Sequence, residues 1–380
     1  ICFVMIKEFY NNENGSLTLS RTISYEYNSS GALATVKDSK TGITTKHYYD
    51  TVGRSTGMYE SGGSSTHRLK YSYDALGRVQ KTTETCGNST YTTEYGYYGD
   101  GKVDTIQTGD SGEKYVYDAY GRLDCWYTFD GEIPRKSDGS VDLDKALIYK
   151  NIHYESPDDR TTSGRAEIWS YLLVNGKSIK YDYGYDANDN IVSEQGVKKD
   201  SKGTSVEVTT YVYDSANQLI RENNKAAGKT WVWTYNDAGN ILSETEYDFT
   251  TGTPTTPQTV RNYGYGDTNW GDLLTSYNGK SISYDAIGNP LNDGTWTYTW
   301  KEGRKLATMS KSGTTWTFTY DVNGMRTQRT AGSTTYNYIY HGSQLTHMTY
   351  GSNVLHFYYD ASGRPLSVTY NGATYYYVLN

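Results

Sequence analysis

The chain has 380 residues, and 42 of its hydrophobic residues are tyrosines, so its aliphatic content is low for this length. A net charge of −7 and a pI near 5.5 argue against nucleic acid or an anionic membrane as a partner. The sequence holds no apolar run long enough to predict a membrane span. Its three cysteines (Cys2, Cys86 and Cys125) are too few and too scattered to predict a disulfide framework or a metal site.

One short motif, Tyr-Asp-x-x-Gly-Arg, recurs along the whole chain. Close copies begin at Tyr49, Tyr73, Tyr117, Tyr284, Tyr320 and Tyr359, with Asn289 and Met325 replacing the arginine in two of them. Looser copies begin at Tyr27, Tyr97, Tyr185, Tyr213, Tyr235 and Tyr340, and Trp300 begins a shorter form. Neighbouring copies mostly lie about 20 residues apart, which indicates an array of one small structural unit.

The length of the repeat predicts a β-hairpin, because two strands of about seven residues and two tight turns fill it. The motif itself predicts the turn: its aspartate accepts a backbone hydrogen bond, and its glycine supplies positive φ. Before the turn, rings such as Trp296, Tyr298 and Trp300 alternate with threonines. Period-two alternation places the rings on one face of a sheet. We therefore assign the motif to turns and packing.

Some fifteen hairpins make about thirty strands, which would extend ~140 Å if laid flat. A sheet that wide must twist, coil or close. The predicted fold class is all-β: an array of antiparallel hairpins that coils into a superhelical strip or a hollow, cocoon-like shell.

The prediction treats residues 1–380 as a single array with two inserted loops, at about 130–165 and 250–258. Regular hairpins are expected from about Leu17, a short helical turn near 143–149, and a decayed repeat at Tyr154. The repeat spacing is tightest from Trp270 to Asn380.

The motif and its spacing resemble the YD-repeat, or Rhs-repeat, family. The segments 270–274, 284–290, 300–304 and 375–380 resemble the region that leads into an Rhs-associated core. Bacterial members resemble polymorphic toxins, in which the repeats form a hollow shell around a C-terminal toxic domain. Insecticidal toxin-complex cocoons and the barrel of teneurins are similar to the same architecture.

The chain departs from that family pattern in two ways. It lacks the Asp-Pro-x-Gly motif of the self-cleaving core, and it stops at Asn380 within the repeat spacing, so we expect it to be part of a longer protein. The resemblance therefore implies architecture and containment but no catalytic residue. No catalytic, cofactor-binding or metal-binding residue is predicted, and no cofactor.

Three groups of residues are candidate sites, and for each the alternative is a purely structural role. The histidines His341, His347 and His356 fall on neighbouring predicted strands, and the aspartates Asp138, Asp142 and Asp144 faintly resemble a calcium loop; for both groups the sequence favours the structural role. Exposed rings stack on sugars, which makes Trp126, Trp169 and Trp270 candidates for glycan binding.

The sequence thus favours a non-enzymatic shell segment that encloses a cargo polypeptide, namely the C-terminal toxin region of its own parent protein. The alternatives are a cell-surface module that binds carbohydrate through tyrosine and tryptophan, and an enzyme with a paired acid and base. The expected location is secreted or at the surface of a bacterial cell.

Overall fold

The computed structural model describes residues 4–13, 16–63, 66–156, 163–360 and 362–377. In these residues, 33 strands and one 3-10 turn follow one another, and each strand pairs antiparallel with the next one along the chain inside two successive sheets. Ile282 marks the break between the sheets, because β22 ends at Ser281 and β23 begins at Ser283.

The first sheet contains 22 strands. They are β1 (Val4–Glu13), β2 (Ser16–Tyr27), β3 (Leu33–Asp38), β4 (Thr44–Tyr49), β5 (Ser55–Ser61), β6 (His67–Tyr73), β7 (Val79–Cys86), β8 (Ser89–Tyr97), β9 (Val103–Thr108), β10 (Ser111–Tyr117), β11 (Leu123–Asp130), β12 (Ile148–Tyr154), β13 (Ala166–Leu173), β14 (Ser178–Tyr185), β15 (Ile191–Asp200), β16 (Gly203–Tyr213), β17 (Leu219–Asn224), β18 (Lys229–Tyr235), β19 (Ile241–Asp248), β20 (Pro257–Gly264), β21 (Ser276–Tyr277) and β22 (Lys280–Ser281).

The second sheet contains 11 strands. They are β23 (Ser283–Tyr284), β24 (Pro290–Asn292), β25 (Thr297–Lys301), β26 (Lys305–Lys311), β27 (Thr314–Tyr320), β28 (Arg326–Ala331), β29 (Thr334–His341), β30 (Gln344–Tyr350), β31 (Asn353–Tyr359), β32 (Pro365–Tyr370) and β33 (Ala373–Tyr376).

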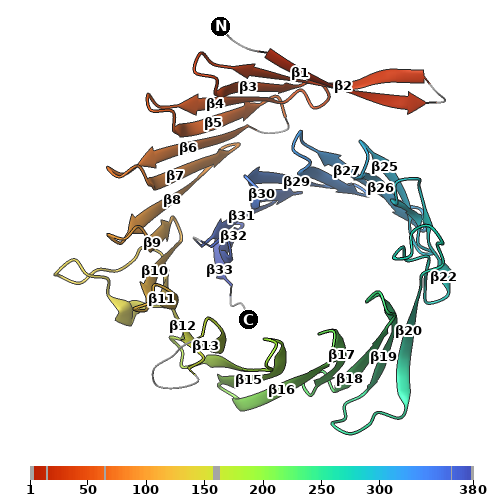
Figure 1. Ribbon diagram of the computed structural model, residues 1–380. Coiled ribbons are helices and arrows are strands. Elements are labelled where there is room, and N and C mark those ends of the chain that lie inside the picture. The colour runs from red at the N-terminus through yellow and green to blue at the C-terminus, as the bar shows by residue number, and fades with distance from the viewer. Residues whose placement is uncertain (1–3, 14–15, 64–65, 157–162, 361, 378–380) are drawn as a thin grey trace.

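The strip of hairpins coils around a central axis and overlaps itself (Figure 1). The chain starts on the outside at β1, runs around the ring through β12–β20, and returns so that β27–β33 pass inside β2–β11. We call β2–β11 the outer turn, β25–β33 the inner turn and the surface between them the seam. The predicted all-β array that coils into a hollow shell is confirmed.

The close copies of the motif form their turns through the aspartate. In the copy that begins at Tyr73, Oδ1 of Asp74 accepts hydrogen bonds from the backbone N–H groups of Leu76 and Arg78, both at 2.9 Å. Nε of Arg78 donates to Oδ2 of Asp74 at 2.6 Å, and Gly77 adopts a φ of +83°. The register then shifts by one residue at Tyr73, which makes a β-bulge. Similar bulges follow in the other copies and twist the strip in one direction.

The motif tyrosine also joins one repeat to the next. The hydroxyl of Tyr97 donates to the backbone carbonyl of Val79 at 2.6 Å, and the guanidinium of Arg78 lies 4.4 Å from the Tyr97 ring centroid. The same hydroxyl-to-carbonyl bond is made by Tyr49, Tyr73, Tyr117, Tyr154, Tyr185, Tyr213, Tyr235, Tyr284 and Tyr359. The decayed repeat predicted at Tyr154 therefore keeps the linking bond.

The structure differs from the sequence prediction at both ends of the array. Among the described residues pairing begins at Val4 rather than near Leu17, because residues 4–10 include the strand-forming Val4, Ile6, Phe9 and Tyr10 although no Tyr-Asp motif precedes them. Tight repeat spacing does not give long strands just after Trp270. There β21, β22 and β23 have two residues each, and the tight turn at Asn278-Gly279 joins β21 to β22.

Two longer connections leave the strip. Residues 131–147 join β11 to β12 and contain the 3-10 turn η1 (Leu143–Lys145), so helical structure occupies only the start of the predicted 143–149 turn. Residues 249–256 join β19 to β20, and Arg221 holds this connection by donating to the carbonyls of Thr250 and Gly252 at 2.8 and 2.6 Å.

Candidate functional site: the lumen and the seam

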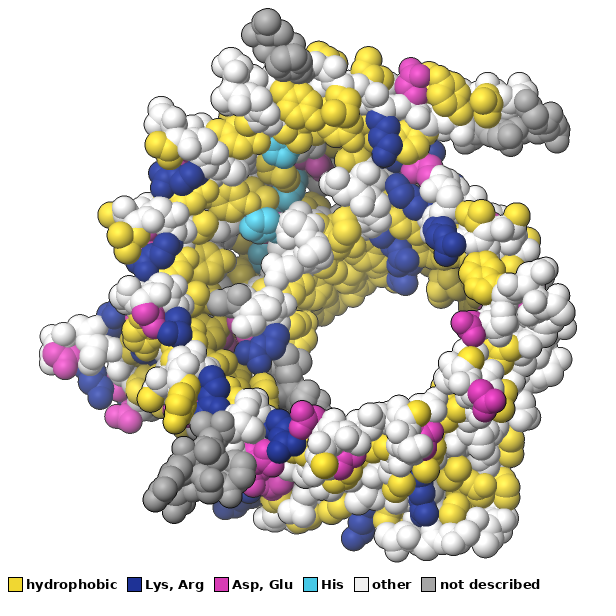
Figure 2. Space-filling view, viewed as in Figure 1, with side chains coloured by type: hydrophobic (Ala, Val, Ile, Leu, Met, Phe, Trp, Pro, Cys, Tyr) yellow, Lys and Arg dark blue, Asp and Glu magenta, His cyan; other side chains and the backbone are white. Residues whose placement is uncertain are grey.

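An open passage runs through the middle of the coil, and it remains open when all atoms are drawn (Figure 2). Much of the visible inner wall is made of hydrophobic and tyrosine side chains. This passage, which we call the lumen, is the largest concave surface in the view and the first candidate for a functional surface.

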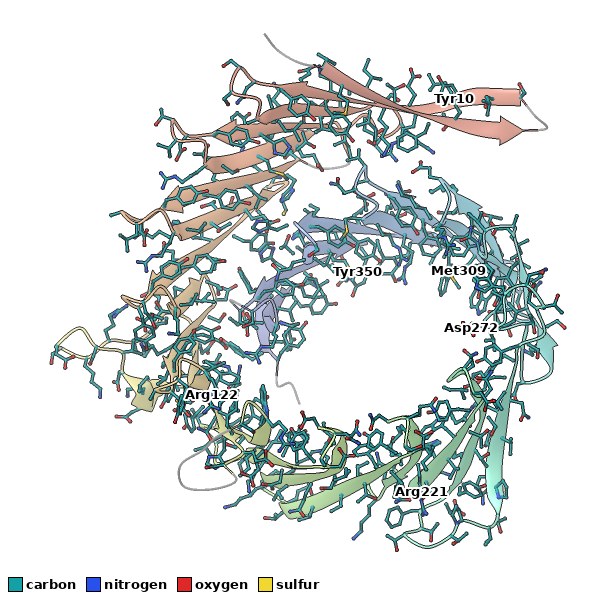
Figure 3. The ribbon with its side chains drawn as sticks, in the orientation of Figure 1. Tyr10, Arg122, Arg221, Asp272, Met309 and Tyr350 are labelled. Atoms are coloured by element: carbon teal, nitrogen blue, oxygen red, sulfur yellow. The ribbon has the colours of Figure 1, made fainter. Side chains whose placement is uncertain are left out.

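The side chains that meet the outer turn settle which face of the inner turn lines the lumen. In β31, His356 stacks on Tyr91 of β8 with ring centroids 3.5 Å apart. Because side chains alternate across a strand, the neighbours Leu355 and Phe357 point to the opposite face. Figure 3 shows Tyr350 of β30 and Met309 of β26 pointing into the lumen.

The face that lines the lumen carries the aromatic ladder. Tyr336 and Tyr350 are cross-strand partners with ring centroids 5.0 Å apart, and the rings of Trp296 and Trp316 lie 5.2 Å apart. These rings remain partly exposed. The ladder predicted from alternating rings therefore forms part of the inner wall, a placement that the sequence alone left open.

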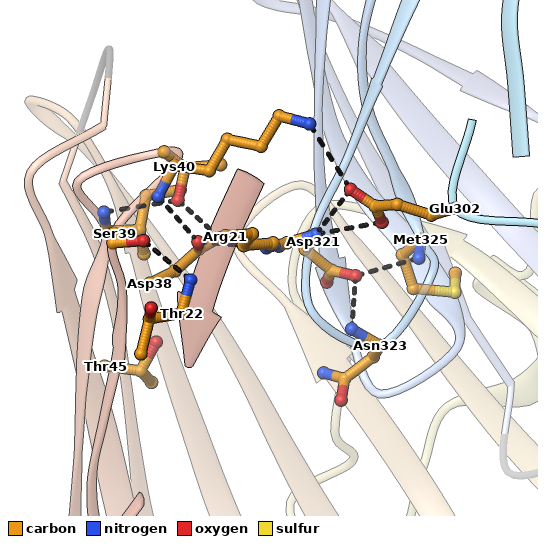
Figure 4. Close-up of polar contacts among 12 residues, drawn as sticks. Arg21, Thr22, Asp38, Ser39, Lys40, Thr45, Glu302, Asp321, Asn323 and Met325 are labelled. Atoms are coloured by element: carbon orange, nitrogen blue, oxygen red, sulfur yellow. Dashed lines mark hydrogen bonds and ion pairs between the residues drawn. The ribbon is translucent and has the colours of Figure 1, made fainter. Parts of the chain in front are cut away.

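The seam begins at a buried ion cluster (Figure 4). Arg21 of β2 pairs with Asp38 of β3 at 2.6 Å and with Glu302 of the inner turn at 3.1 Å. Lys40 and Lys305 also contact Glu302, at 3.4 and 2.9 Å. The Arg21 side chain is only 1% exposed, so this cluster joins the two turns away from solvent.

The carboxyl groups of this cluster are held in their charged form. Burial alone would raise the pKa of Asp38, but hydrogen bonds from Arg21, Thr41 and the Lys40 backbone outweigh it and lower that pKa below its ordinary value. Burial likewise opposes ionisation of Glu302, and its hydrogen bond to Lys305 and the nearby positive charges lower its pKa overall.

The middle of the seam is a cluster of buried histidines and acceptors. The hydroxyl of Tyr71 lies 2.7 Å from Nε2 of His341, and Thr346 donates to Glu84 of β7 at 2.7 Å. Glu84 also accepts a hydrogen bond from His67 of β6 at 2.7 Å. The histidines gather where the two turns meet, as Figure 2 shows in cyan.

The far end of the seam is polar as well. The hydroxyl oxygens of Ser111 and Ser367 lie 3.1 Å apart, and both residues are fully buried. Thr369 donates to Asp110 at 2.9 Å, and Tyr376 donates to Asp130 at 2.8 Å. The turns therefore meet through specific polar contacts along their whole overlap.

The predicted histidine group lies in this seam. His347 and His356 are cross-strand partners, and their rings lie 5.9 Å apart. Burial lowers the pKa of His341 and of His347, and it lowers the pKa of His356 to about 3. All three are thus placed to be neutral where the turns pack.

The tryptophan and aspartate candidates from the sequence have structural surroundings or lie away from the seam. Trp126 is 5% exposed in a core cluster and has Arg364 of the inner turn 5.4 Å from its ring, so it offers no face to a sugar. Trp169 packs edge-on against Trp126, whereas Trp270 is 47% exposed. Asp138 accepts hydrogen bonds from the backbone and hydroxyl of Ser140, as an ordinary turn residue does.

Sequence reasoning missed the residues that close the coil. Arg21 and Glu302 are separated by 281 positions, and Glu84 and Thr346 by 262. One signal was present: charged residues such as Arg21 and Glu84 stand on the strand face that the repeat pattern gives to packing.

Comparisons with known proteins agree with this architecture. A family model for the teneurin YD-shell matches residues 3–130. The tRNA3(Ser)-specific nuclease WapA of Bacillus spizizenii is 34% identical over 175 residues, which cover 44% of this chain and 7% of that protein. The tRNA nuclease WapA of Bacillus subtilis is 33% identical over 137 residues, which cover 35% of this chain and 5% of that protein.

Among solved structures, the crystal structure of TcdB2-TccC3-Cdc42 aligns with 96% of this chain and 24% of its own, at 12% identity and a TM-score of 0.48. That of TcdB2-TccC3 aligns with 94% and 23%, at 13% identity and a TM-score of 0.46. The chain thus spans a small part of each of these proteins.

The repeated motif, its turn and the coiled strip of hairpins define a YD-repeat shell protein. Together with the family model matched over residues 3–130 and the WapA relatives, they support a YD-repeat, or Rhs-repeat, family for this chain. The described residues contain no helix that is long and apolar enough to cross a membrane.

Proposed function

We propose that this chain is a wall segment of a container that encloses a polypeptide cargo in its lumen. The observation that carries the proposal is the self-overlap of the strip, which turns an open sheet into a wall around a passage. The cargo we favour is a toxic region of the same parent protein, and the wall itself has no catalytic task.

The chemistry of the inner wall suits an unfolded or partly folded polypeptide. Tyrosine and tryptophan rings offer apolar contact area and also a polar group, so they accept mixed side chains without a specific pocket. Buried carboxylates are hydrogen-bonded to other residues of the wall. Glu113, for example, accepts hydrogen bonds from Tyr115, Thr128 and Lys150 at 2.5, 2.9 and 3.2 Å. Such residues support a structural role.

Containment needs the seam to stay closed, and the ion cluster around Arg21 serves that purpose. Removing one partner of a buried ion pair leaves an uncompensated charge and typically costs about 3–5 kcal/mol. We place this container outside the producing cell or at its surface, and we expect a bacterial source, as for the WapA relatives.

The proposal is tested by protease protection in the protein encoded by the complete reading frame. Proteinase K is added to the wild type and to an Arg21→Ala variant, and the fragments are identified by mass spectrometry. We expect the cargo segment to resist cleavage in the wild type and to be cut in Arg21→Ala, where the seam is weakened.

A matched control is Lys37→Ala, which removes the exposed pair Lys37–Glu26, whose side chains are 52% and 38% exposed. Exposed pairs contribute little, so protection should persist there. A cargo segment that is cut as fast in the wild type as in Arg21→Ala overturns containment. So does a reading frame that encodes no polypeptide besides the shell.

A further inference from the structure

A group of metal-ligand side chains lies in the outer turn directly beneath the seam. His67 of β6 and Cys86 of β7 are cross-strand partners, and Glu84 stands two residues before Cys86 on the same face. His67 is 2% exposed, and Cys86 and Glu84 are each 5% exposed. Their ligand atoms all lie within 4.8 Å of one another.

The composition of this group selects a class of metal. An imidazole nitrogen, a thiolate sulfur and a carboxylate oxygen are together typical of zinc and of its close substitutes such as cobalt. Calcium and magnesium prefer sites made of oxygen ligands alone. The ligand set is therefore one for a borderline-soft divalent cation.

The spacing requires only a small adjustment to accept such an ion. Zinc binds nitrogen, oxygen and sulfur at about 2.0–2.3 Å, so tetrahedral neighbours lie roughly 3.3–3.7 Å apart. Sγ of Cys86 is 3.8 Å from Oε1 of Glu84, near that value. Nε2 of His67 and Oε1 of Glu84 are 2.7 Å apart, so they must separate by roughly half an ångström.

A second, independent observation comes from the inner turn. His347 and His356 are 5% and 3% exposed, and the Nδ1 atom of each is buried without a hydrogen-bond partner. Leaving a buried polar atom unpaired costs about 1–3 kcal/mol. Thr346, next to His347 in β30, already donates to Glu84 across the seam, and His356 is the cross-strand partner of His347. The two unsatisfied nitrogens thus belong to the part of the inner turn that contacts the cluster.

We propose that His67, Glu84 and Cys86 form a zinc-type metal site, and that an imidazole of His347 or His356 completes it from the inner turn. Binding converts the Cys86 thiol into a metal-bound thiolate and releases one proton to solvent. Metal–ligand bonds then link the two turns directly, because the ligands come from both sides of the seam. The inference does not depend on what the lumen contains.

The proposal is tested by titrating cobalt into the purified chain after treatment with EDTA and a reductant. A thiolate–cobalt charge-transfer band in the near ultraviolet, together with intense visible bands, reports a tetrahedral site with a cysteine ligand. We expect one cobalt per chain, displacement by zinc, and a higher urea midpoint with zinc bound. A wild-type chain that shows no saturable thiolate–cobalt band overturns the proposal.

Variants assign the ligands. Cys86→Ser should remove the charge-transfer band, whereas Cys125→Ser, which removes a second buried thiol away from the cluster, should keep it. Cys2→Ser serves as the control for the remaining thiol. A band that persists in Cys86→Ser overturns the site.

The contribution of the inner turn is tested separately. The double variant His347→Gln/His356→Gln should weaken cobalt binding by about 10–100-fold or more, since loss of a supporting group alone typically has that effect. His153 is an exposed histidine on β12, and His153→Gln should leave cobalt binding unchanged. Circular dichroism verifies that each variant is folded. Unchanged affinity in the folded double variant overturns completion of the site across the seam.

Discussion

At the scale of single residues, the motif tyrosine has two tasks, of which the sequence showed only one. The alternating pattern predicted its ring as a packing element. Its hydroxyl, however, reaches the carbonyl that follows the preceding motif, as in Tyr97 to Val79. That bond depends on the distance between adjacent hairpins, which the sequence does not encode locally.

Replacement of Tyr97 by phenylalanine isolates this bond. The ring and its contact with Arg78 remain, but the hydrogen bond to the Val79 carbonyl is lost, so we expect a loss of about 0.5–1.5 kcal/mol in the free energy of unfolding. Urea denaturation measures the loss, and hydrogen exchange should locate it in β7 and β8. Tyr48→Phe is the control, because Tyr48 is 48% exposed, and we expect a change within about 0.5 kcal/mol. Equal losses in the two variants would contradict the linking role.

At the scale of elements, the turn of each hairpin is set by one position with positive φ. Gly53 has a φ of +87°, and no other atom lies within 4 Å of where its Cβ would be. In weaker copies of the motif the same position is taken by Asp189 at +67° and Asn217 at +60°. The turn therefore requires a backbone conformation rather than an absent side chain.

Two substitutions of Gly53 separate conformation from space. Gly53→Ala should destabilise the chain by about 1–2 kcal/mol, because alanine rarely adopts left-handed φ. Gly53→Asn should cost less, because asparagine tolerates this region. Thermal or urea unfolding of the two variants gives the order, and an alanine variant as stable as the asparagine variant would show that strain at φ does not set this turn.

Element by element, the sequence predicted what is local and periodic. The β25 strand, in which Tyr298 and Trp300 alternate with threonines, was predicted because ring and threonine positions repeat every two residues. The two-residue strands β21–β23 were not predicted, because the Tyr-Asp motif at Tyr284 stays intact although the strands before it are short. The spacing of the motif therefore predicts where the turns lie, but it does not predict how long the strands are.

At the scale of the whole molecule, the decisive event is the overlap of the two turns. Coiling was predicted from the width of the sheet, but the strands that meet are determined by the sum of many small twists and bulges. No local pattern specifies that Arg21 will meet Glu302 or that Glu84 will meet Thr346. The shell class could thus be predicted, whereas the seam and its clusters required the structure.

The ion cluster makes closure of the coil dependent on pH. The pKa values of Asp38 and Glu302 are lower in the folded chain than their ordinary values of 3.8 and 4.5. A carboxyl group with a lowered pKa stabilises the fold above its ordinary pKa, and that contribution is lost as the pH falls through the folded value. The seam should therefore be intact from neutral pH to about pH 5 and should weaken progressively below about pH 4.5.

Small-angle scattering of the chain between pH 7 and pH 3 measures this opening as a rise in the radius of gyration, while circular dichroism verifies that the strands persist. Glu302→Gln removes one titrating group from the cluster, so its coil should be looser at pH 7 and should change less between pH 5 and pH 3 than the wild type. Glu94→Gln is the control, because Glu94 is 54% exposed in a surface pair with Lys81. The difference between the two variants isolates Glu302 from all other titrating groups. A Glu302→Gln curve parallel to that of Glu94→Gln would show that the cluster around Arg21 does not hold the turns together, and closure would then have to reside in the neutral contacts farther along the seam.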